Sequence, residues 1–253
     1  MGQTGRKPAR QSTAATSRIR ERPDVAVATR LVLASASPAR LAVLRSAGIE
    51  PIVRVSGVDE DAITASMGGS ATPEQVVVRL AQAKAHSVAN DITPSLDGVC
   101  WAGANDVLNC VVVGCDSMLH IDGDLQGKPL TPDVTRERWK TMMGRSGDLL
   151  TGHCVVRIQD GTIVGEAVGC STTTVHFSEP SEQDLEAYLA TEEPLHVAGA
   201  FTLDSLGGWF VDRIEGDPSS VIGIGLPLVR TLLHEVGLSV AELWRDSPSP
   251  AQL

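Results

Sequence analysis

The hydrophobic positions of this chain fall into two patterns, short unbroken runs and helical repeats. Residues 31–34 and 110–114 are unbroken apolar runs, which are typical of strands buried on both faces of a sheet. In residues 72–89 the apolar positions recur about every four residues and share one face of a helix. Segments of both kinds in one chain predict an α/β protein.

The first predicted strand leads directly into a helix. Ser37 is suited to cap that helix, Pro38 to its first position and Gly48 to its end. The amides of a first helical turn are unsatisfied and the helix dipole favours negative charge, and Arg40 lies in this turn. The stretch therefore fits an anion-binding site, although an ordinary capped strand–helix unit has the same features.

Two further charged residues stand where ligand chemistry is expected. Asp116 follows the run at residues 110–114, and open α/β sheets bind ligands at the carboxyl ends of their strands. Lys84 lies on the apolar face of the helix predicted over residues 72–89. A lysine there commonly extends its ammonium to solvent, and the alternative is an ammonium directed into a cleft toward an anion.

An acidic cluster, residues 57–61, follows a strand predicted over residues 51–56. Acidic loops are usually only solvated, but carboxylates at a strand end can also hold a divalent cation. Farther along, the turn signal at residues 122–124 predicts a hairpin that can return Lys128 toward Asp116.

The same signals predict the remaining elements. These are helices over residues 131–143 and 181–190, strands over residues 149–158, 162–177 and 209–215, loops over residues 90–109 and 193–201, and a final helix that ends at Gly237.

Charge is distributed unevenly along the 253 residues. Residues 1–22 carry six basic residues against one acidic residue, a net +5, so the remainder carries −15 of the total −10. An acidic body excludes a nucleic-acid-binding surface on the folded part of the chain. We predict a disordered basic arm over residues 1–27, one folded domain over residues 28–245 with a loop insertion at residues 90–109, and a frayed tail over residues 246–253.

Cysteine usage and hydropathy indicate a compartment. The five cysteines are scattered without a CxxC pair, and no signal peptide or membrane-length apolar run is visible. We therefore expect reduced thiols, a cytoplasmic location and no membrane contact.

Seven short motifs occur in a fixed order along the chain. They are SASPAR at residues 35–40, VDE at 58–60, AQAKA at 81–85, GCDS at 114–117, GKP at 127–129, EP…AGAF at 193–201 and GLPL at 225–228. Together they resemble the motifs of the Maf family, the septum-formation-inhibitor-like nucleoside triphosphate pyrophosphatases. The resemblance runs from residue 31 to about residue 237, and the ordered set is far more specific than any one motif.

The resemblance implies a mixed, twisted α/β sheet with flanking helices in two lobes around a cleft. It also implies hydrolysis of nucleoside triphosphates to monophosphate and pyrophosphate, assisted by Mg²⁺ or Mn²⁺. By position, Asp116 matches the catalytic base, and Glu60 with Asp116 the metal ligands. The positions matched to substrate binding are Ser35, Ser37, Arg40, Lys84 and Lys128. Such hydrolysis needs a carboxylate to activate water and cations to hold the triphosphate, so these residue types suit it.

Four positions depart from the family pattern: Ala39, Gly147, Val197 and Asp204. They fall near the substrate end of the family's site, so the base preference stays open, with dTTP, UTP or a modified nucleotide as candidates. Two other functions also remain. One is a cell-division regulator that binds nucleotide and in which catalysis is secondary. The other is an inosine-triphosphate-type pyrophosphatase that prefers purines. The oligomeric state also stays open, with a homodimer as one alternative.

Overall fold

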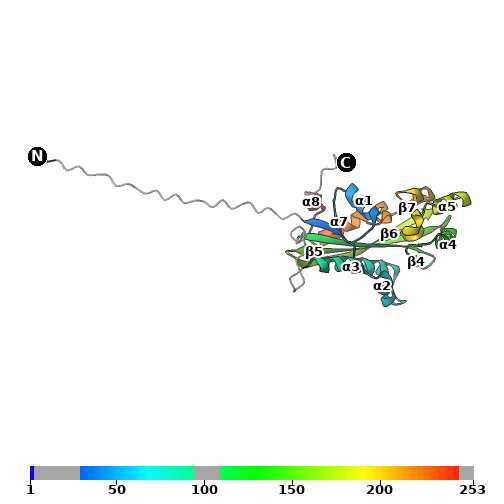
Figure 1. The fold of residues 1–253 in the computed structure, drawn as a ribbon, viewed down its shortest axis with the longest axis horizontal. Coiled ribbons are helices and arrows are strands. Elements are labelled where there is room, and N and C mark those ends of the chain that lie inside the picture. The colour runs from blue at the N-terminus through cyan, green and yellow to red at the C-terminus, as the bar shows by residue number, and fades with distance from the viewer. Residues whose placement is uncertain (3–28, 94–108, 245–253) are drawn as a thin grey trace.

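A computed structural model describes residues 1–2, 29–93 and 109–244 of the chain, and its centre is one mixed sheet (Figure 1). The seven strands follow the order β2-β1-β3-β5-β6-β7, and β4 pairs with β3. β1 is parallel to both β2 and β3, whereas the other pairings are antiparallel. Helices flank this sheet, which confirms the predicted mixed α/β class.

Strands and helices are interspersed along the described part of the chain. The strands are β1 (Arg30–Leu33), β2 (Ile52–Val53), β3 (Cys110–Ile121), β4 (Asp124–Gln126), β5 (Ser146–Gln159), β6 (Thr162–Phe177) and β7 (Val211–Glu215). The helices are α1 (Pro38–Ser46), α2 (Glu60–Met67), α3 (Pro73–Ile92), α4 (Pro132–Met142), α5 (Glu182–Leu189), α6 (Pro218–Ile222), α7 (Leu226–Glu235) and α8 (Val240–Trp244), with 3-10 turns η2 (Glu193–His196), η3 (Ala198–Ala200) and η4 (Leu206–Phe210). Within the described residues, no helix has both the length and the apolar character needed to cross a membrane.

Local capping chemistry fixes where several helices begin. The Ser37 side chain accepts a hydrogen bond from the amide of Arg40, and Pro38 opens α1 as predicted. Thr72 and Gln75 form a complete capping box at the start of α3. Because these contacts lie within four residues, the sequence alone is enough to predict them.

Several element boundaries differ from the prediction. The acidic cluster at residues 57–61 is not only a loop, because Asp59 caps α2 and Glu60 is its first residue. α3 continues to Ile92, into the predicted loop, and the strand expected over residues 51–56 is reduced to β2. The remaining differences are the short helices α6 and α8, which were not predicted, a start of β5 at Ser146, and a start of β7 at Val211 because η4 precedes it. The expected arm at residues 1–27 (apart from residues 1–2), the tail at residues 246–253 and most of the loop at residues 90–109 lie outside the described residues.

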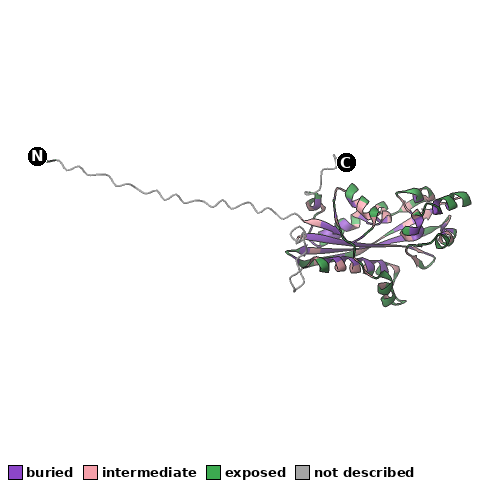
Figure 2. Ribbon diagram, viewed as in Figure 1, coloured by how far each residue is buried: buried purple, intermediate pink, exposed green. Residues whose placement is uncertain are grey.

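Two apolar cores lie on one face of the sheet, at opposite ends. In the first, α1, α7 and α8 cover buried residues of β1, β3 and β5 that include Leu33 and Val113. In the second, α4 and α5 cover the far ends of β3, β5 and β6 around Trp139 (Figures 1 and 2). Between the cores, the same face carries hydroxyl side chains, Ser117 on β3 and Thr151 opposite it on β5. This division supports the two lobes expected from the motifs.

The other face of the sheet is covered by α3, which packs directly on backbone. A Cβ atom at Gly114 would lie 2.3 Å from the carbonyl oxygen of Ala81, and one at Gly152 would lie 2.3 Å from that of Val77. Only glycine permits this approach. It brings Lys84 of α3 within reach of β3.

β3 has a gap along one edge. β1 pairs with it only as far as Val113, and β4 pairs with it from Leu119 onward. Residues 114–118 pair with β5 on one side, while no described strand pairs with their other side. The pairing of the parallel strands β1 and β3 therefore ends where one edge of β3 has no described neighbouring strand. α/β sheets bind ligands at positions of this kind.

Candidate active site

The centre of the site is a buried ion pair between Asp116 and Lys84. The Lys84 Nζ lies 2.6 Å from Oδ1 of Asp116, and the two residues are 8% and 5% exposed respectively. The same ammonium lies 2.8 Å from Oε1 of Glu60, whose side chain is half-exposed. Of the two alternatives for Lys84, extension of its ammonium to solvent is therefore wrong. It faces inward and joins two carboxylates.

Asp116 has one oxygen without a partner. Its Oδ2 is buried and accepts no hydrogen bond from the described residues. Burial raises the pKa of Asp116, while the charges of Lys84 and Arg40 act to lower it. A buried carboxylate with a vacant lone pair is suited to accept a proton or to bind a cation.

Arg40 lies on the other face of β3 and is held by three hydrogen bonds. Its Nε donates to the carbonyl of Gly223 at 2.8 Å, its Nη1 to Oγ of Ser35 at 3.0 Å, and its Nη2 to Oγ of Ser117 at 3.3 Å. Ser35 also accepts from the amide of Ser37 at 3.1 Å. The turn after β1 and the first turn of α1 thus form one connected donor group beside the β3 edge.

A row of hydrogen-bonded hydroxyl groups continues from this site across the neighbouring strands β3, β5 and β6. Ser117 and Thr151 are 3.1 Å apart, and Thr151 donates to the carbonyl of Ser220 at 2.9 Å. The Ser220 hydroxyl in turn lies 3.1 Å from that of Thr173. These four residues fix α6, and with it the Gly223 carbonyl that holds Arg40.

His153 anchors the same region from β5. Its Nε2 accepts a hydrogen bond of 2.8 Å from the amide of Gly225, at the start of α7. Burial, together with the charge of Arg40, lowers the pKa of His153 to about 4. The ring is therefore neutral and structural.

Lys128 is not joined to this group. Its side chain is exposed, and within the described residues it makes no hydrogen bond or ion pair. Two surface hollows, of about 410 and 480 Å³, lie instead beside α4 and α5, and their linings do not include Asp116, Lys84 or Arg40. The predicted return of Lys128 toward Asp116 thus stays a prediction.

Sequence reasoning placed most charged members of the site, together with Ser35 and Ser37, but missed the other hydroxyl residues. Ser117, Thr151 and Ser220 all make buried or half-buried contacts around Arg40. Ser117 was part of a quoted motif without a role, and Thr151 gave no signal of its own. A hydroxyl within an otherwise apolar buried strand is the feature that could have indicated Ser117 and Thr151, whereas Ser220 lies on α6.

The four departures from the family pattern have different settings. Gly147 is buried, and a Cβ there would lie 3.0 Å from Cδ1 of Leu119, so a larger residue requires Leu119 to move. Ala39 and Val197 are half-buried, and Asp204 is exposed. None of the four contacts Asp116 or Lys84 through a hydrogen bond in the described part of the chain.

The family model and the similar proteins agree on one family for this chain. The family model described as Maf-like protein matches residues 30–236. A nucleoside triphosphate pyrophosphatase of Rhodococcus jostii is 67% identical over 219 residues, which are 87% of this chain and 98% of that protein. Proteins of the same name from Rhodococcus opacus and Mycobacterium marinum are 66% and 55% identical, over 87% and 88% of this chain and 98% and 100% of their own lengths. These matches confirm the resemblance predicted from the ordered motifs.

Proposed function

The chain belongs to the Maf-like protein family, and from that premise we propose that it hydrolyses nucleoside triphosphates to nucleoside monophosphate and pyrophosphate. The observation that carries this proposal is the buried carboxylate of Asp116, with its vacant Oδ2, at the open edge of β3. Lysine and arginine cations approach that edge from the two faces of the sheet.

In the proposed reaction Asp116 is the general base. It accepts a proton from a water molecule whose oxygen forms a bond to the α-phosphorus. The bond between the α-phosphorus and the bridging oxygen breaks, and pyrophosphate leaves. The raised pKa of Asp116 favours this role, since a more basic carboxylate is a stronger proton acceptor.

Basic and hydroxyl groups bind the triphosphate in this proposal. Arg40, oriented by Ser35, offers a fixed guanidinium, and the Ser37 turn lies at the N-terminus of α1, where anions are favoured. Lys84 stabilises negative charge close to Asp116. Lys128, being exposed and unpaired within the described residues, is free to move toward phosphate.

A divalent cation, Mg²⁺ or Mn²⁺, fits the donor set. Asp116 Oδ2 has no partner among described groups and the Glu60 carboxylate is half-exposed, and hard cations prefer such oxygen ligands. These two residues would hold the ion. When bound, it polarises the phosphate and offsets the charge of two neighbouring carboxylates.

Further aspects of the proposal concern the cell. The four cysteines within the described ranges carry free thiols, which supports a reducing cytoplasm. There the enzyme would remove unwanted nucleotides, as a monomer or a homodimer. The alternative is a cell-division regulator in which catalysis is secondary. It uses the same nucleotide site, but its cellular role depends on nucleotide binding rather than on hydrolysis.

The experiment that tests the proposal measures pyrophosphate release. Wild type, Asp116→Asn and the exposed control Asp124→Asn are supplied with dTTP, UTP, purine, inosine and methylated triphosphates, with Mg²⁺ and with Mn²⁺. We expect activity on a subset of these, a loss of at least about 100-fold in kcat for Asp116→Asn, and no loss for the control.

Each other outcome has a definite meaning. No pyrophosphate from any nucleotide overturns the proposal, and nucleotide binding by calorimetry without turnover favours the regulator. A preference for inosine triphosphate favours the purine-cleaning alternative. Near-wild-type turnover of Asp116→Asn rules out Asp116 as the base.

A further inference from the structure

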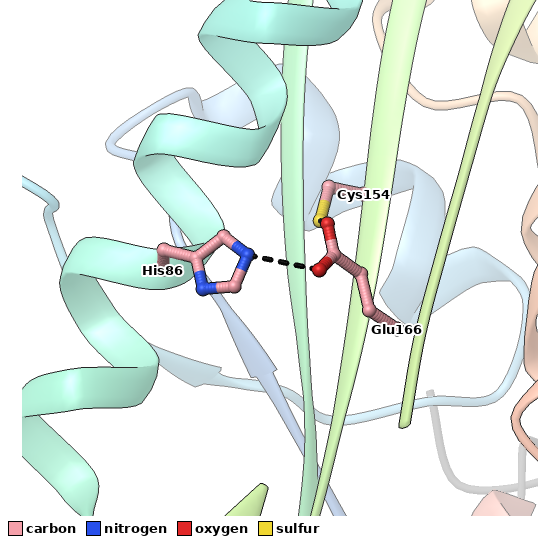
Figure 3. A group of neighbouring side chains, drawn as sticks. All are labelled: His86, Cys154 and Glu166. Atoms are coloured by element: carbon pink, nitrogen blue, oxygen red, sulfur yellow. Dashed lines mark hydrogen bonds and ion pairs between the residues drawn. The ribbon is translucent and has the colours of Figure 1, made fainter. Parts of the chain in front are cut away.

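Three potential metal ligands meet on the flank of α3 that faces β6. They are His86 on α3, Cys154 on β5 and Glu166 on β6, and Figure 3 shows the imidazole and the thiol directed toward the carboxylate. One ligand atom from each residue lies within 4.8 Å of the other two. The hydrolytic site does not use any of them.

The distances between these atoms approach those of a metal shell. His86 Nε2 lies 3.1 Å from Oε2 of Glu166, and Cys154 Sγ lies 3.7 Å from Oε1 of the same carboxylate. With metal bonds of about 2.0–2.3 Å to nitrogen, oxygen and sulfur, neighbouring ligand atoms of a tetrahedral shell are about 3.3–3.6 Å apart. With all three ligand atoms within 4.8 Å of one another, the side chains are close enough for one ion to contact all three once they rotate toward it.

The cluster is separate from the pair of Asp116 and Lys84. Lys84 and His86 are two positions apart on α3, which places them about 200° apart around the helix axis. Lys84 faces β3, whereas His86 faces Glu166 on β6, two strands away in the sheet. An ion bound at His86 is therefore not the ion proposed beside Glu60.

We propose that His86, Cys154 and Glu166 form a binding site for a thiophilic divalent cation of the Zn²⁺ class. One thiolate, one imidazole and one carboxylate suit such a cation and do not suit Mg²⁺, which prefers oxygen ligands alone. A fourth position remains for water or for the amide oxygen of Gln82, whose amide nitrogen donates a hydrogen bond of 3.0 Å to Oε1 of Glu166.

Binding exchanges one set of contacts for another. The metal ion enters from the side of His86 and Glu166, whose side chains are 37% and 34% exposed, and displaces the 3.1 Å contact between them. Cys154 is fully buried, and burial raises the pKa of its thiol, so the metal-free chain holds the proton. On binding, the S–H bond breaks, a sulfur–metal bond forms and the proton passes to solvent.

Cobalt is the probe for this site. The full chain, stripped of metal with a chelator, is titrated with Co²⁺, and absorption is followed for the thiolate-to-cobalt band and for the d–d bands of a tetrahedral ion. We expect one Co²⁺ per chain at the thiolate band, displacement by Zn²⁺ and none by excess Mg²⁺. Zn²⁺ also raises the Tm by several degrees, because it binds only the folded chain.

Variants assign the ligands. Since loss of an outer partner already costs about 10- to 100-fold in metal affinity, His86→Gln and Glu166→Gln are expected to cost at least about 100-fold, and Cys154→Ser to abolish the thiolate band. Cys170→Ser, a partly buried thiol outside the cluster, is the control and retains the band. The two partly exposed ligands keep the test valid if Cys154→Ser misfolds.

Two results overturn the proposal: no thiolate band with wild type, or a band that survives both His86→Gln and Glu166→Gln. The inference does not depend on the proposed hydrolysis. Asp116→Asn removes the catalytic base and retains the cobalt band, so failure of either idea is seen without the other.

Discussion

Lys84 and Asp116 form a buried contact of 2.6 Å that joins α3 to the central strand β3. The contact exists because glycine at positions 114 and 152 lets the helix lie against the backbone of β3 and β5. A positive charge is thereby placed beside the proposed base, where it counteracts the effect of burial on the base's pKa.

Replacing Lys84 by methionine tests this coupling. Burial raises the pKa of Asp116 and Lys84 acts against the rise, so the pKa goes up further in Lys84→Met. Because the base works only when ionised, the rise of kcat/KM with pH moves to higher pH. Loss of the ammonium that stabilises negative charge beside Asp116 also lowers kcat/KM at neutral pH by about 10- to 100-fold. A pH–rate profile measures the shift. Lys140→Met, an exposed lysine on α4, is the control, and an unmoved profile for Lys84→Met contradicts the coupling.

Arg40→Lys tests whether the guanidinium fork is needed. A lysine cannot reproduce the three separate hydrogen bonds to Gly223, Ser35 and Ser117. We expect KM for the triphosphate to rise by about tenfold or more and the free energy of unfolding to fall by about 1–3 kcal/mol. Steady-state kinetics and denaturant unfolding measure both. Arg45→Lys, whose arginine pairs with Glu50 on the surface, is expected to change neither.

His153 gives the protein a pH-dependent stability. Its folded pKa of about 4 is below the ordinary 6.5, so the unfolded chain binds more protons between these values. The contribution of His153 to the free energy of unfolding is therefore constant above about pH 6.5. It falls by about 3 kcal/mol as the pH drops to about 4. In His153→Gln, urea titrations across this range should show a flatter dependence, and an unchanged slope assigns the effect to other groups.

Gly152→Ala tests the close packing of α3. The new methyl group meets the Val77 carbonyl at 2.3 Å, so the helix must move away from β5. We expect a loss of about 3 kcal/mol in unfolding free energy, together with a large loss of kcat as Lys84 leaves Asp116. Gly69→Ala, at a glycine with open space around it, is the matched control. Full activity in Gly152→Ala would show that the helix position is not critical.

The sequence predicted those parts of the site that rest on short-range signals. Ser37 and Thr72 each cap a helix through a contact with a residue three positions later, and Asp116 follows an apolar run. α2 was missed because none of its residues is buried, so it has no apolar periodicity to detect. Arg40 binds groups 77 and 183 residues away, and a pairing over such separations leaves no local trace.

Between Val113 and Leu119, β3 pairs with β5 but has no described strand on its other side, so the lengths of β1 and β4 matter for the proposed site. Five residues at about 3.3 Å each leave an opening of roughly 16 Å along the strand. Extending β1 or β4 by even two residues would add main-chain hydrogen bonds and stabilise the sheet, while closing the edge at which Asp116 is proposed to meet its ligand. The fold therefore leaves main-chain hydrogen bonds unformed at its centre, which lowers its stability and keeps one edge of β3 free of a pairing strand. Variants selected only for heat resistance are expected to extend β1 or β4 along that edge and to lose turnover.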